Sequence, residues 1–248
     1  GFALASRAIP RRWLLDAEGV AILRRLRAEP DHYIVSAEAQ ALATRADALP
    51  LYFPQGAPTV VEIGVPDVER SAALLAPLLA RFGDLTYLPV APHRAALDAP
   101  AKALLRAHPR LRIRGVVGRP EDAIHLARGA TGPVLLFWPG AGLAGYERAE
   151  CTAMLRAIAS GLRSADLLVA GLDLRKDPRA VERCHADRKG LAKELHLNLL
   201  GRIARDLGAA VDPALFRHRV VYDPDAGRLE AHVVSRRAQT LHVPALDT

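Results

Sequence analysis

Glu230 and His232 are the residues whose types and spacing most directly suggest binding chemistry. They stand two apart in "RLEAHVVS", which has the pattern of a strand, so both side chains are expected on one face. A carboxylate there could accept a hydrogen bond from an imidazole or pair with a cationic group. The alternative is an ordinary polar strand face on which the histidine is satisfied locally, and the two residues alone leave both interpretations open.

A second feature is the segment "VVEIGVPDVER", which is typical of a strand entering a tight turn. In a nucleotide-binding fold this turn is rich in glycine, so that a ligand can approach the backbone. Glu62 and Gly64 fit that pattern. Pro66, however, adds bulk and removes an N–H donor. The segment therefore predicts a vestigial cofactor loop, in which Gly64 is kept for the turn itself.

Metal-binding and nucleophilic chemistry find little support. His185 and His196 lie eleven residues apart on one expected helix, a rise of about 16 Å, so they cannot share an ion unless the helix breaks. Cys184, His185 and Asp187 are crowded rather than spaced as chelating ligands. We find no serine in a nucleophile-elbow pattern and no phosphate loop, and we predict no metal ligand and no catalytic side chain.

The composition is that of an ordinary globular protein, with half of the 248 residues hydrophobic and a quarter charged. The net charge is +7, but the arginines that dominate the basic residues are spread along the chain, so nucleic-acid binding is not the expected role. The longest apolar runs, such as "VLLFW", are too short to span a membrane.

The expected location is the cytoplasm. Cys151 and Cys184 make no disulfide framework, which fits a reducing compartment. The segment "GFALASRAIPRRWLL" lacks a basic stretch followed by an apolar one, so no signal peptide is predicted. Because the first residue is Gly1 rather than Met, we expect the N-terminus to have been processed or trimmed.

A mainly parallel sheet is expected to position these residues. Five short apolar runs alternate with segments of helical periodicity, which is the pattern of an α/β doubly wound fold. The expected strands are "PTVVEIGV", "LTYLPVA", "RLRIRGVVG", "GPVLLFWPG" and "ADLLVAGLDL". The expected helices between them are "ERSAALLAPLLARFG", "APAKALLRAHP" and "ECTAMLRAIASGL". Residues 56–178 should form this Rossmann-like core.

A smaller α+β lobe is expected from residues 1–55 and 179–248. Its first part contains a helix in "DAEGVAILRRLRAEP", and its last part contains one long helical region from Ala180 to Gly208, the expected C-cap. The segments "HRVVYDP" and "RLEAHVVSRRAQTLHV", joined by "PDAG", predict a β-hairpin.

The order of these motifs resembles that of the histidine-specific S-adenosylmethionine (SAM)-dependent methyltransferases, which trimethylate the α-amine of histidine on the way to ergothioneine. The similarity covers nearly the whole chain. It is carried by "RRWLLDAEGVAILRRL", "EPDHYIVSAEA", "LLVAGLDLRKDP", "HLNLLGRIARDLGA" and "FRHRVVYDPDAGRLEAHVVSRRAQTLHV". The resemblance implies a Rossmann-like methyltransferase domain, but fold does not by itself establish function.

The resemblance also implies roles for individual residues. The acid at the position of Glu230 helps to recognise the substrate imidazole, and His232 shares its strand face. Tyr33 falls in the segment that closes over the substrate, although a core tyrosine is an alternative. Asn198 keeps the second asparagine of its motif, whereas His196 replaces the first, and both could simply cap or cross-link the lobe.

Four positions depart from the family's ligand-binding pattern, namely Pro66, Ala91, Arg119 and Ala144. The family has an acid for the ribose hydroxyls at the position of Ala91 and an aspartate near the adenine amine at that of Arg119. Ala144 replaces the asparagine of a loop that helps to grip the substrate. Each lost charge-assisted hydrogen bond costs about 1.5–3 kcal/mol. The two missing acids alone would therefore weaken SAM binding by several tenfold steps.

We therefore expect a degenerate, non-catalytic family member that needs no cofactor and acts as a structural or partner subunit. The family continues beyond the hairpin to add the last strands of its sheet. A protein partner is accordingly expected to cover the fifth-strand edge near Leu167 to Leu174. One alternative is an active SAM-dependent amino-acid N-methyltransferase with a remodelled cofactor pocket and another substrate. A further one is a protein that binds a small ligand in the old cleft.

Overall fold

The computed structural model describes residue 9 and residues 11–140, 142–185 and 188–246. The chain forms two compact units. The first, here called the sheet unit, comprises residues 34–173, and the second, the hairpin unit, comprises residues 1–33 and 174–248.

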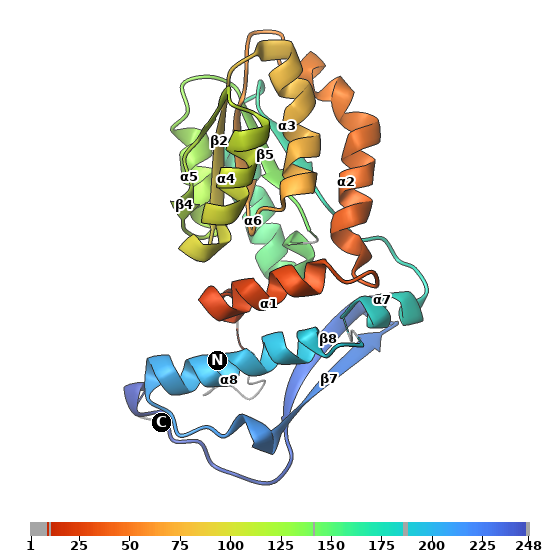
Figure 1. The fold of residues 1–248 in the computed structure, drawn as a ribbon, viewed down its shortest axis with the longest axis vertical. Helices are drawn as coiled ribbons and strands as arrows, with labels where there is room; N and C mark the ends of the chain where they lie inside the picture. Colours follow the sequence, from red (N-terminus) through yellow and green to blue (C-terminus); the bar gives the residue numbers. More distant parts are fainter. Residues whose placement is uncertain (1–8, 10, 141, 186–187, 247–248) are drawn as a thin grey trace. The chain divides into compact units, whose positions relative to one another are not determined.

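A mainly parallel sheet forms the centre of the sheet unit (Figure 1). Its strands are β1 (Thr59–Ile63), β2 (Leu85–Ala91), β3 (Leu111–Ile113), β4 (Val116–Val117), β5 (Val134–Trp138) and β6 (Leu167–Ala170). Their order is β3-β2-β1-β5-β6, with β4 also paired to β2, and every pair is parallel. This arrangement confirms the predicted α/β, Rossmann-like fold.

Helices cover both faces of this sheet because the strands are apolar on both sides. The helices of the unit are α2 (Tyr33–Arg45), α3 (Val68–Phe82), α4 (Asp98–Ala107), α5 (Pro120–Arg128) and α6 (Arg148–Gly161). Leu74 of α3 and Leu104 of α4 pack in one core cluster with Val60 of β1. Ile124 of α5 and Ile158 of α6 pack in another cluster, on the opposite face.

Two details of the sheet unit differ from the sequence prediction. The third predicted strand is two strands, β3 and β4, separated by Arg114 and Gly115. Helix α5 was not predicted, although Pro120 at its first position and Glu121 in its first turn are helix-start signals. Its nine-residue segment is short, although Ala123, Ile124 and Ala127 follow a helical period and are buried.

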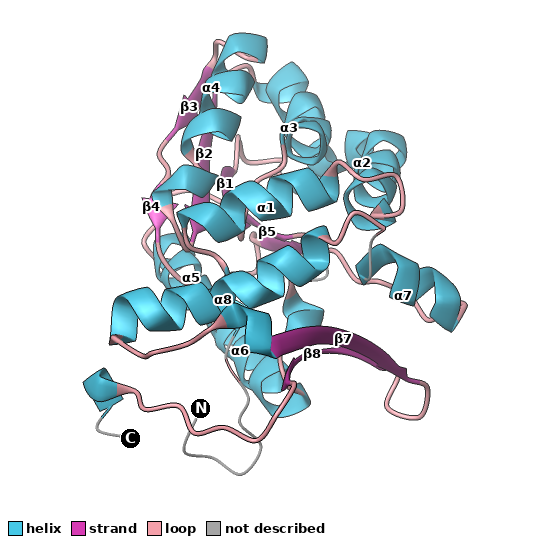
Figure 2. Ribbon diagram, turned by 60° about the horizontal axis from the view of Figure 1, so that its bottom comes forward, coloured by secondary structure: helices cyan, strands magenta, loops and turns pink. Residues whose placement is uncertain are grey.

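The hairpin unit consists of α1 (Ala17–Arg27), α7 (Pro178–His185), α8 (Leu191–Leu207), β7 (Phe216–Asp223) and β8 (Arg228–Ser235). Strands β7 and β8 form the predicted antiparallel hairpin. Helix α8 packs along α1 and against the hairpin (Figures 1 and 2). Gly208 ends α8 in the left-handed conformation, with φ 70°, as expected of a C-cap glycine.

The expected long helix from Ala180 to Gly208 is instead two helices. Gly190 adopts φ +74°, which lies outside the helical region, and α8 begins only at the next residue. His185 and His196 therefore lie on different helices. Asp187 lies outside the described residues.

The boundary between the units also differs from the predicted one. Residues 34–55 were assigned to the smaller lobe but belong to the sheet unit. The reason is apolar packing, since Phe53 is 2% exposed and shares a core cluster with Val60, against which Leu42 and Leu49 pack. Likewise, the second boundary falls after Asp173 rather than after residue 178.

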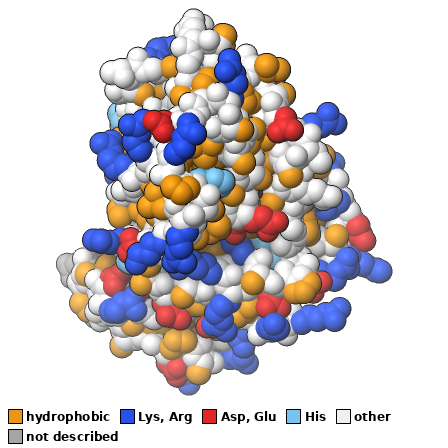
Figure 3. All heavy atoms as spheres, turned by 45° about the horizontal axis from the view of Figure 1, so that its top comes forward, with side chains coloured by type: hydrophobic (Ala, Val, Ile, Leu, Met, Phe, Trp, Pro, Cys, Tyr) orange, Lys and Arg blue, Asp and Glu red, His pale blue; other side chains and the backbone are white. Residues whose placement is uncertain are grey.

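Charged side chains of both signs lie on the face of the molecule shown in Figure 3. On the face shown in Figure 3, Lys and Arg side chains are scattered, with Asp and Glu side chains among them. Within the described ranges, no helix combines the length and apolar character needed to cross a membrane.

Candidate functional site

The carboxyl ends of β1, β2 and β4 meet at one edge of the sheet, which is where open α/β sheets bind ligands. The Gly64 N–H, just after β1, donates to the carbonyl of Val90 at 2.8 Å. The Gly118 N–H, just after β4, donates to the carbonyl of Ala91 at 2.9 Å. Residues that follow these three strands are therefore close neighbours.

The turn after β1 needs its glycine for conformational reasons. Gly64 has φ +110°, a value that residues with side chains rarely adopt. Pro66 is buried, and Asp67 caps α3 by accepting a hydrogen bond from the Arg70 N–H at 3.2 Å. The turn is thus a compact strand-to-helix connection, and its glycine is required whether or not a ligand binds.

Glu62, a predicted cofactor-binding residue, points into the sheet unit. Its side chain is fully buried and accepts hydrogen bonds from the Tyr87 hydroxyl at 2.6 Å and the Ser71 hydroxyl at 2.8 Å. The Arg70 Nη2 lies 3.3 Å from its Oε1. Residues of the same unit therefore supply donors to both carboxylate oxygens of Glu62.

Tyr87 is strongly coupled to this carboxylate. Burial, together with the negative charge of Glu62, raises the pKa of Tyr87 well above 10.0. The tyrosine is consequently a neutral donor at physiological pH, and a charge-assisted bond links β2 to β1.

We expect Tyr87→Phe to lower the free energy of unfolding by about 1.5–3 kcal/mol at neutral pH, because a buried carboxylate loses a donor. A raised folded-state pKa gives stability that is present below the unfolded pKa and is lost as pH rises through the folded one. Wild type should therefore lose stability above about pH 10, whereas the variant lacks this loss. Urea unfolding at about pH 8 and about pH 11 measures both effects. An equal alkaline loss in the two proteins would contradict the coupling.

A second, partly buried contact joins α2, α3 and the loop after β5. Both oxygens of the Glu38 carboxylate accept from the Gly140 N–H, at 2.6 and 2.9 Å. The Arg70 Nη1 lies 3.2 Å from Oε2 of Glu38. Because Arg70 also pairs with Glu62, one guanidinium bridges two carboxylates, and it is only 1% exposed.

The remaining departures from the family pattern offer no carboxylate at this edge. Ala91 ends β2 with a fully buried side chain. Arg119 is exposed at the start of α5, where its N–H donates to Asp122 at 2.7 Å. Ala144 is exposed in a 3-10 turn after β5.

In the hairpin unit, the structure brings Glu230 and His232 together on β8, as their spacing predicted. His232 Nε2 lies 3.1 Å from one oxygen of Glu230, and Arg228 Nη2 lies 2.5 Å from the other. All three side chains are partly exposed. This group could bind a polar ligand, but Arg228 already neutralises the carboxylate.

Tyr33 and Asn198 make separate contacts. The Tyr33 ring lies 4.2 Å from Lys176 Nζ in a cation–π arrangement. Asn198 donates to Asp16 Oδ1 at 2.9 Å, and Asp16 is the N-cap of α1. Burial opposes ionisation of Asp16, yet hydrogen bonds from Gly19, Asn198 and Arg205 lower its pKa. Asn198 thus links α8 to the start of α1.

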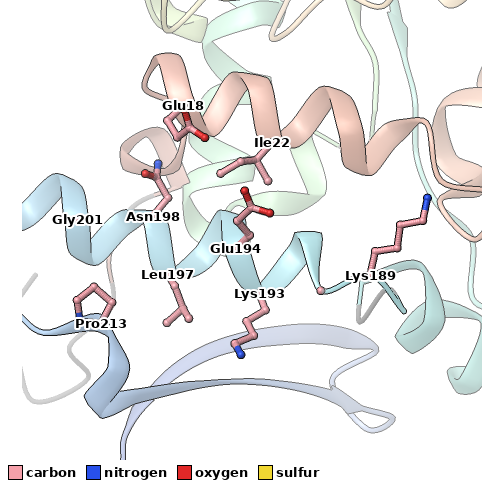
Figure 4. Close-up of a pocket in the computed structure, with 10 residues that line it drawn as sticks. Glu18, Ile22, Lys189, Lys193, Glu194, Leu197, Asn198, Gly201 and Pro213 are labelled. Carbon is pink, nitrogen blue, oxygen red and sulfur yellow. The ribbon is translucent and has the colours of Figure 1, made fainter.

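A groove of about 540 Å³ lies in the hairpin unit beside α1 and α8 (Figure 4). Glu194 and Asn198 point toward α1, whereas Lys193 and Leu197 point away from it. Glu194 pairs with Arg25 at 2.9 Å. The polar groups facing α1 are thus engaged within the unit, which makes the groove a weak candidate for ligand binding.

Among the described residues, no group of three or more His, Cys, Asp or Glu side chains is placed to hold a metal ion. The break at Gly190 removes the single-helix argument against a shared ion at His185 and His196. His196 nevertheless has other contacts: its Nδ1 lies 2.7 Å from the Ala192 carbonyl oxygen, and its ring stacks on that of His218. Its Nδ1 is therefore already engaged within the hairpin unit.

Sequence reasoning missed Glu38, Arg70, Ser71 and Tyr87. Arg70 could have been noticed from the sequence, because it is a charged residue in the first turn of α3, directly after the β1 loop. Glu38 gave no such signal, because it lies 102 residues from Gly140 in the chain.

Comparisons with known proteins agree with this architecture. A family model described as "Histidine-specific methyltransferase, SAM-dependent" matches residues 1–248. The histidine N-alpha-methyltransferase of Mycolicibacterium smegmatis is 29% identical over 253 residues, covering 100% of this chain and 76% of the relative. That of Mycobacterium tuberculosis is 27% identical, with the same coverage. Ergothioneine biosynthesis protein 1 of Schizosaccharomyces pombe is 21% identical over 94% of this chain and 31% of its own length.

Proposed function

Because the chain belongs to the family of histidine-specific, SAM-dependent methyltransferases, we propose that it is a member that has lost SAM-dependent methyl transfer and serves as a structural or partner subunit. The family implies SAM as cofactor and an amino acid as substrate. The proposal rests on the residues that this chain has at the ligand-binding edge of its sheet.

The observation that carries the proposal is that the residues at the family's cofactor positions, Glu62, Ala91 and Arg119, offer no free carboxylate. At the end of β2, Ala91 is fully buried and has no acceptor for a ribose hydroxyl. Glu62 is buried and accepts hydrogen bonds from Arg70, Ser71 and Tyr87 of its own unit. After β4, Arg119 brings a positive charge where the family has an aspartate. These residues do not match what SAM requires.

A partner is proposed to bind at the β6 edge of the sheet. Among the strands that the structure describes, β6 pairs only with β5. Its residues Leu167 to Val169 are half-buried, and Leu172, just beyond it, is 61% exposed. An added strand would satisfy the free backbone groups of β6 and cover these side chains.

The proposal is tested by titrating the purified protein with SAM in a calorimeter, with and without histidine. We expect no saturable heat at millimolar SAM, because the acceptors for ribose and adenine are missing. Micromolar binding would contradict the proposal. It would favour an active N-methyltransferase with another substrate, for which Glu230, His232 and Tyr33 would be the first residues to examine.

A further inference from the structure

Helix α8 contains a glycine that the contacts of the hairpin unit do not explain. Gly201 lies inside the helix, and its φ is not among the positive values that require glycine. Among the described residues, a Cβ added there would meet no heavy atom within 4 Å outside the helix's own backbone. Glycine inside a helix is less stable than alanine, because it loses more conformational freedom on folding. The chain thus keeps a destabilising residue at a place where a side chain would fit.

The space beside Gly201 belongs to the groove of about 540 Å³ that lies beside α1 and α8 (Figure 4). Ile22 of α1, which is 1% exposed, and the half-buried Leu197 of α8 give the groove apolar walls. The exposed Pro213 also lines it. A stretch of helix backbone without a side chain therefore borders a partly apolar groove, an arrangement that allows another backbone to approach closely.

Two charged side chains of this groove have no partner in the part of the chain that the structure describes. Glu194 pairs with Arg25 at 2.9 Å. In contrast, the exposed Glu18 of α1 and Lys193 of α8 make no ion pair or side-chain hydrogen bond with a described residue. Lys193 points away from α1, which carries Glu18 (Figure 4). An occupant that matches the groove must therefore bring a base to one side of it and an acid to the other.

We propose that this groove is the interface between two copies of the chain, related by a two-fold axis that passes through it. In such an interface both copies contribute the same surface, so each contact between two different residues occurs twice. Lys193 of each copy then lies against Glu18 of the other, and both free charges are paired. The two α8 helices approach each other at Gly201, where no side chain separates them. The apolar walls of the groove are covered at the same time.

This inference goes beyond the proposed function and is independent of it. The interface lies within the hairpin unit, whereas the partner proposed above binds at the β6 edge of the sheet unit. The tests measure self-association rather than SAM binding, so either proposal can fail alone.

The first test measures the mass of the full wild-type chain by sedimentation equilibrium, from about 1 μM to about 500 μM protein. Salt at about 150 mM reduces the Debye length to about 8 Å, which screens the repulsion between two copies that each carry a net charge of +7. We expect the average mass to rise with concentration toward that of two chains. A mass that stays at one chain over this range overturns the inference.

Charge exchange tests which surface forms the dimer. Lys193→Glu and Glu18→Lys each create two like-charge contacts, so each variant alone should form the dimer about tenfold more weakly than wild type. A mixture of the two variants should associate as tightly as wild type, because every contact in the mixed dimer joins opposite charges. Lys102→Glu is the control: it makes the same change on an exposed side chain of α4 and should leave the dimer unchanged. If the mixture associates no better than either variant alone, the inference is wrong.

Gly201→Gln gives an independent test, because its two expected effects are opposite in sign. Glutamine is a better helix former and enters open space, so the melting temperature measured at about 1 μM protein should rise by about 1–4 °C. The same side chain fills the room that the second α8 needs, so the dimer should weaken about tenfold or more. A higher melting temperature with an unchanged dimer would show that Gly201 lies outside the interface and would overturn the inference.

Discussion

Arg70→Met is expected to lower the free energy of unfolding by about 3–5 kcal/mol, the usual cost of removing one partner from a buried ion pair. The guanidinium is 1% exposed and lies between two carboxylates, those of Glu62 and Glu38. Without it, Glu62 stays fully buried with a negative charge and only hydroxyl donors. Methionine fills a similar volume, so the loss measures charge and hydrogen bonding rather than a cavity.

Urea unfolding, followed by circular dichroism, measures this effect. Arg94→Met is the control, because Arg94 is 82% exposed in its pair with Asp98 and its loss should have no measurable effect. Adding Glu62→Gln to Arg70→Met should restore part of the stability, since no unpaired charge is then buried. Equal midpoints for wild type and Arg70→Met would show that the network does not hold the start of α3 to the sheet.

Much of the sheet could be predicted because its signals are local. The segment of β5, VLLFW, is an uninterrupted apolar run, and those of β1 and β2 are mostly apolar, as strands covered on both faces require. The division of the third strand could not be predicted, since Arg114 and Gly115 interrupt an otherwise regular pattern. The break before α8 depends on the positive φ of Gly190, whereas a helical period continues on both sides of it.

The candidate site likewise contains contacts that could be predicted from the sequence and contacts that could not. Glu230 and His232 could be paired from sequence because the two-residue period of a strand places them on one face. The Glu38 contact with Gly140 depends on how α2 packs near the end of β5, and no short-range pattern encodes that. The sequence therefore indicated which residues depart from the family's ligand-binding pattern, but not which contacts within the chain are made at the same edge.

Restoring the acids should restore cofactor binding. We expect the triple variant Pro66→Gly, Ala91→Asp, Arg119→Asp to bind SAM about 10²–10⁴-fold more tightly than wild type, because each recovered charge-assisted bond contributes about 1.5–3 kcal/mol. The geometry favours cooperation between the two acids. Strands β2 and β4 are paired, with Ala91 opposite Val117, and Arg119 lies two residues beyond Val117, so the two carboxylates would lie on neighbouring segments at this edge of the sheet.

Calorimetric titration with SAM, on variants shown to be folded, measures whether the triple variant binds SAM more tightly than wild type. The control carries Pro66→Gly with Ala91→Asn and Arg119→Asn, which matches the size of the acids without their charge and should lose most of the gain. If the folded triple variant binds no better than wild type, the missing acids are not what disables the site. The next explanation would be the Glu38 carboxylate on the Gly140 N–H, because it occupies a donor at the end of β5, and adding Glu38→Ala to the triple variant would test it directly.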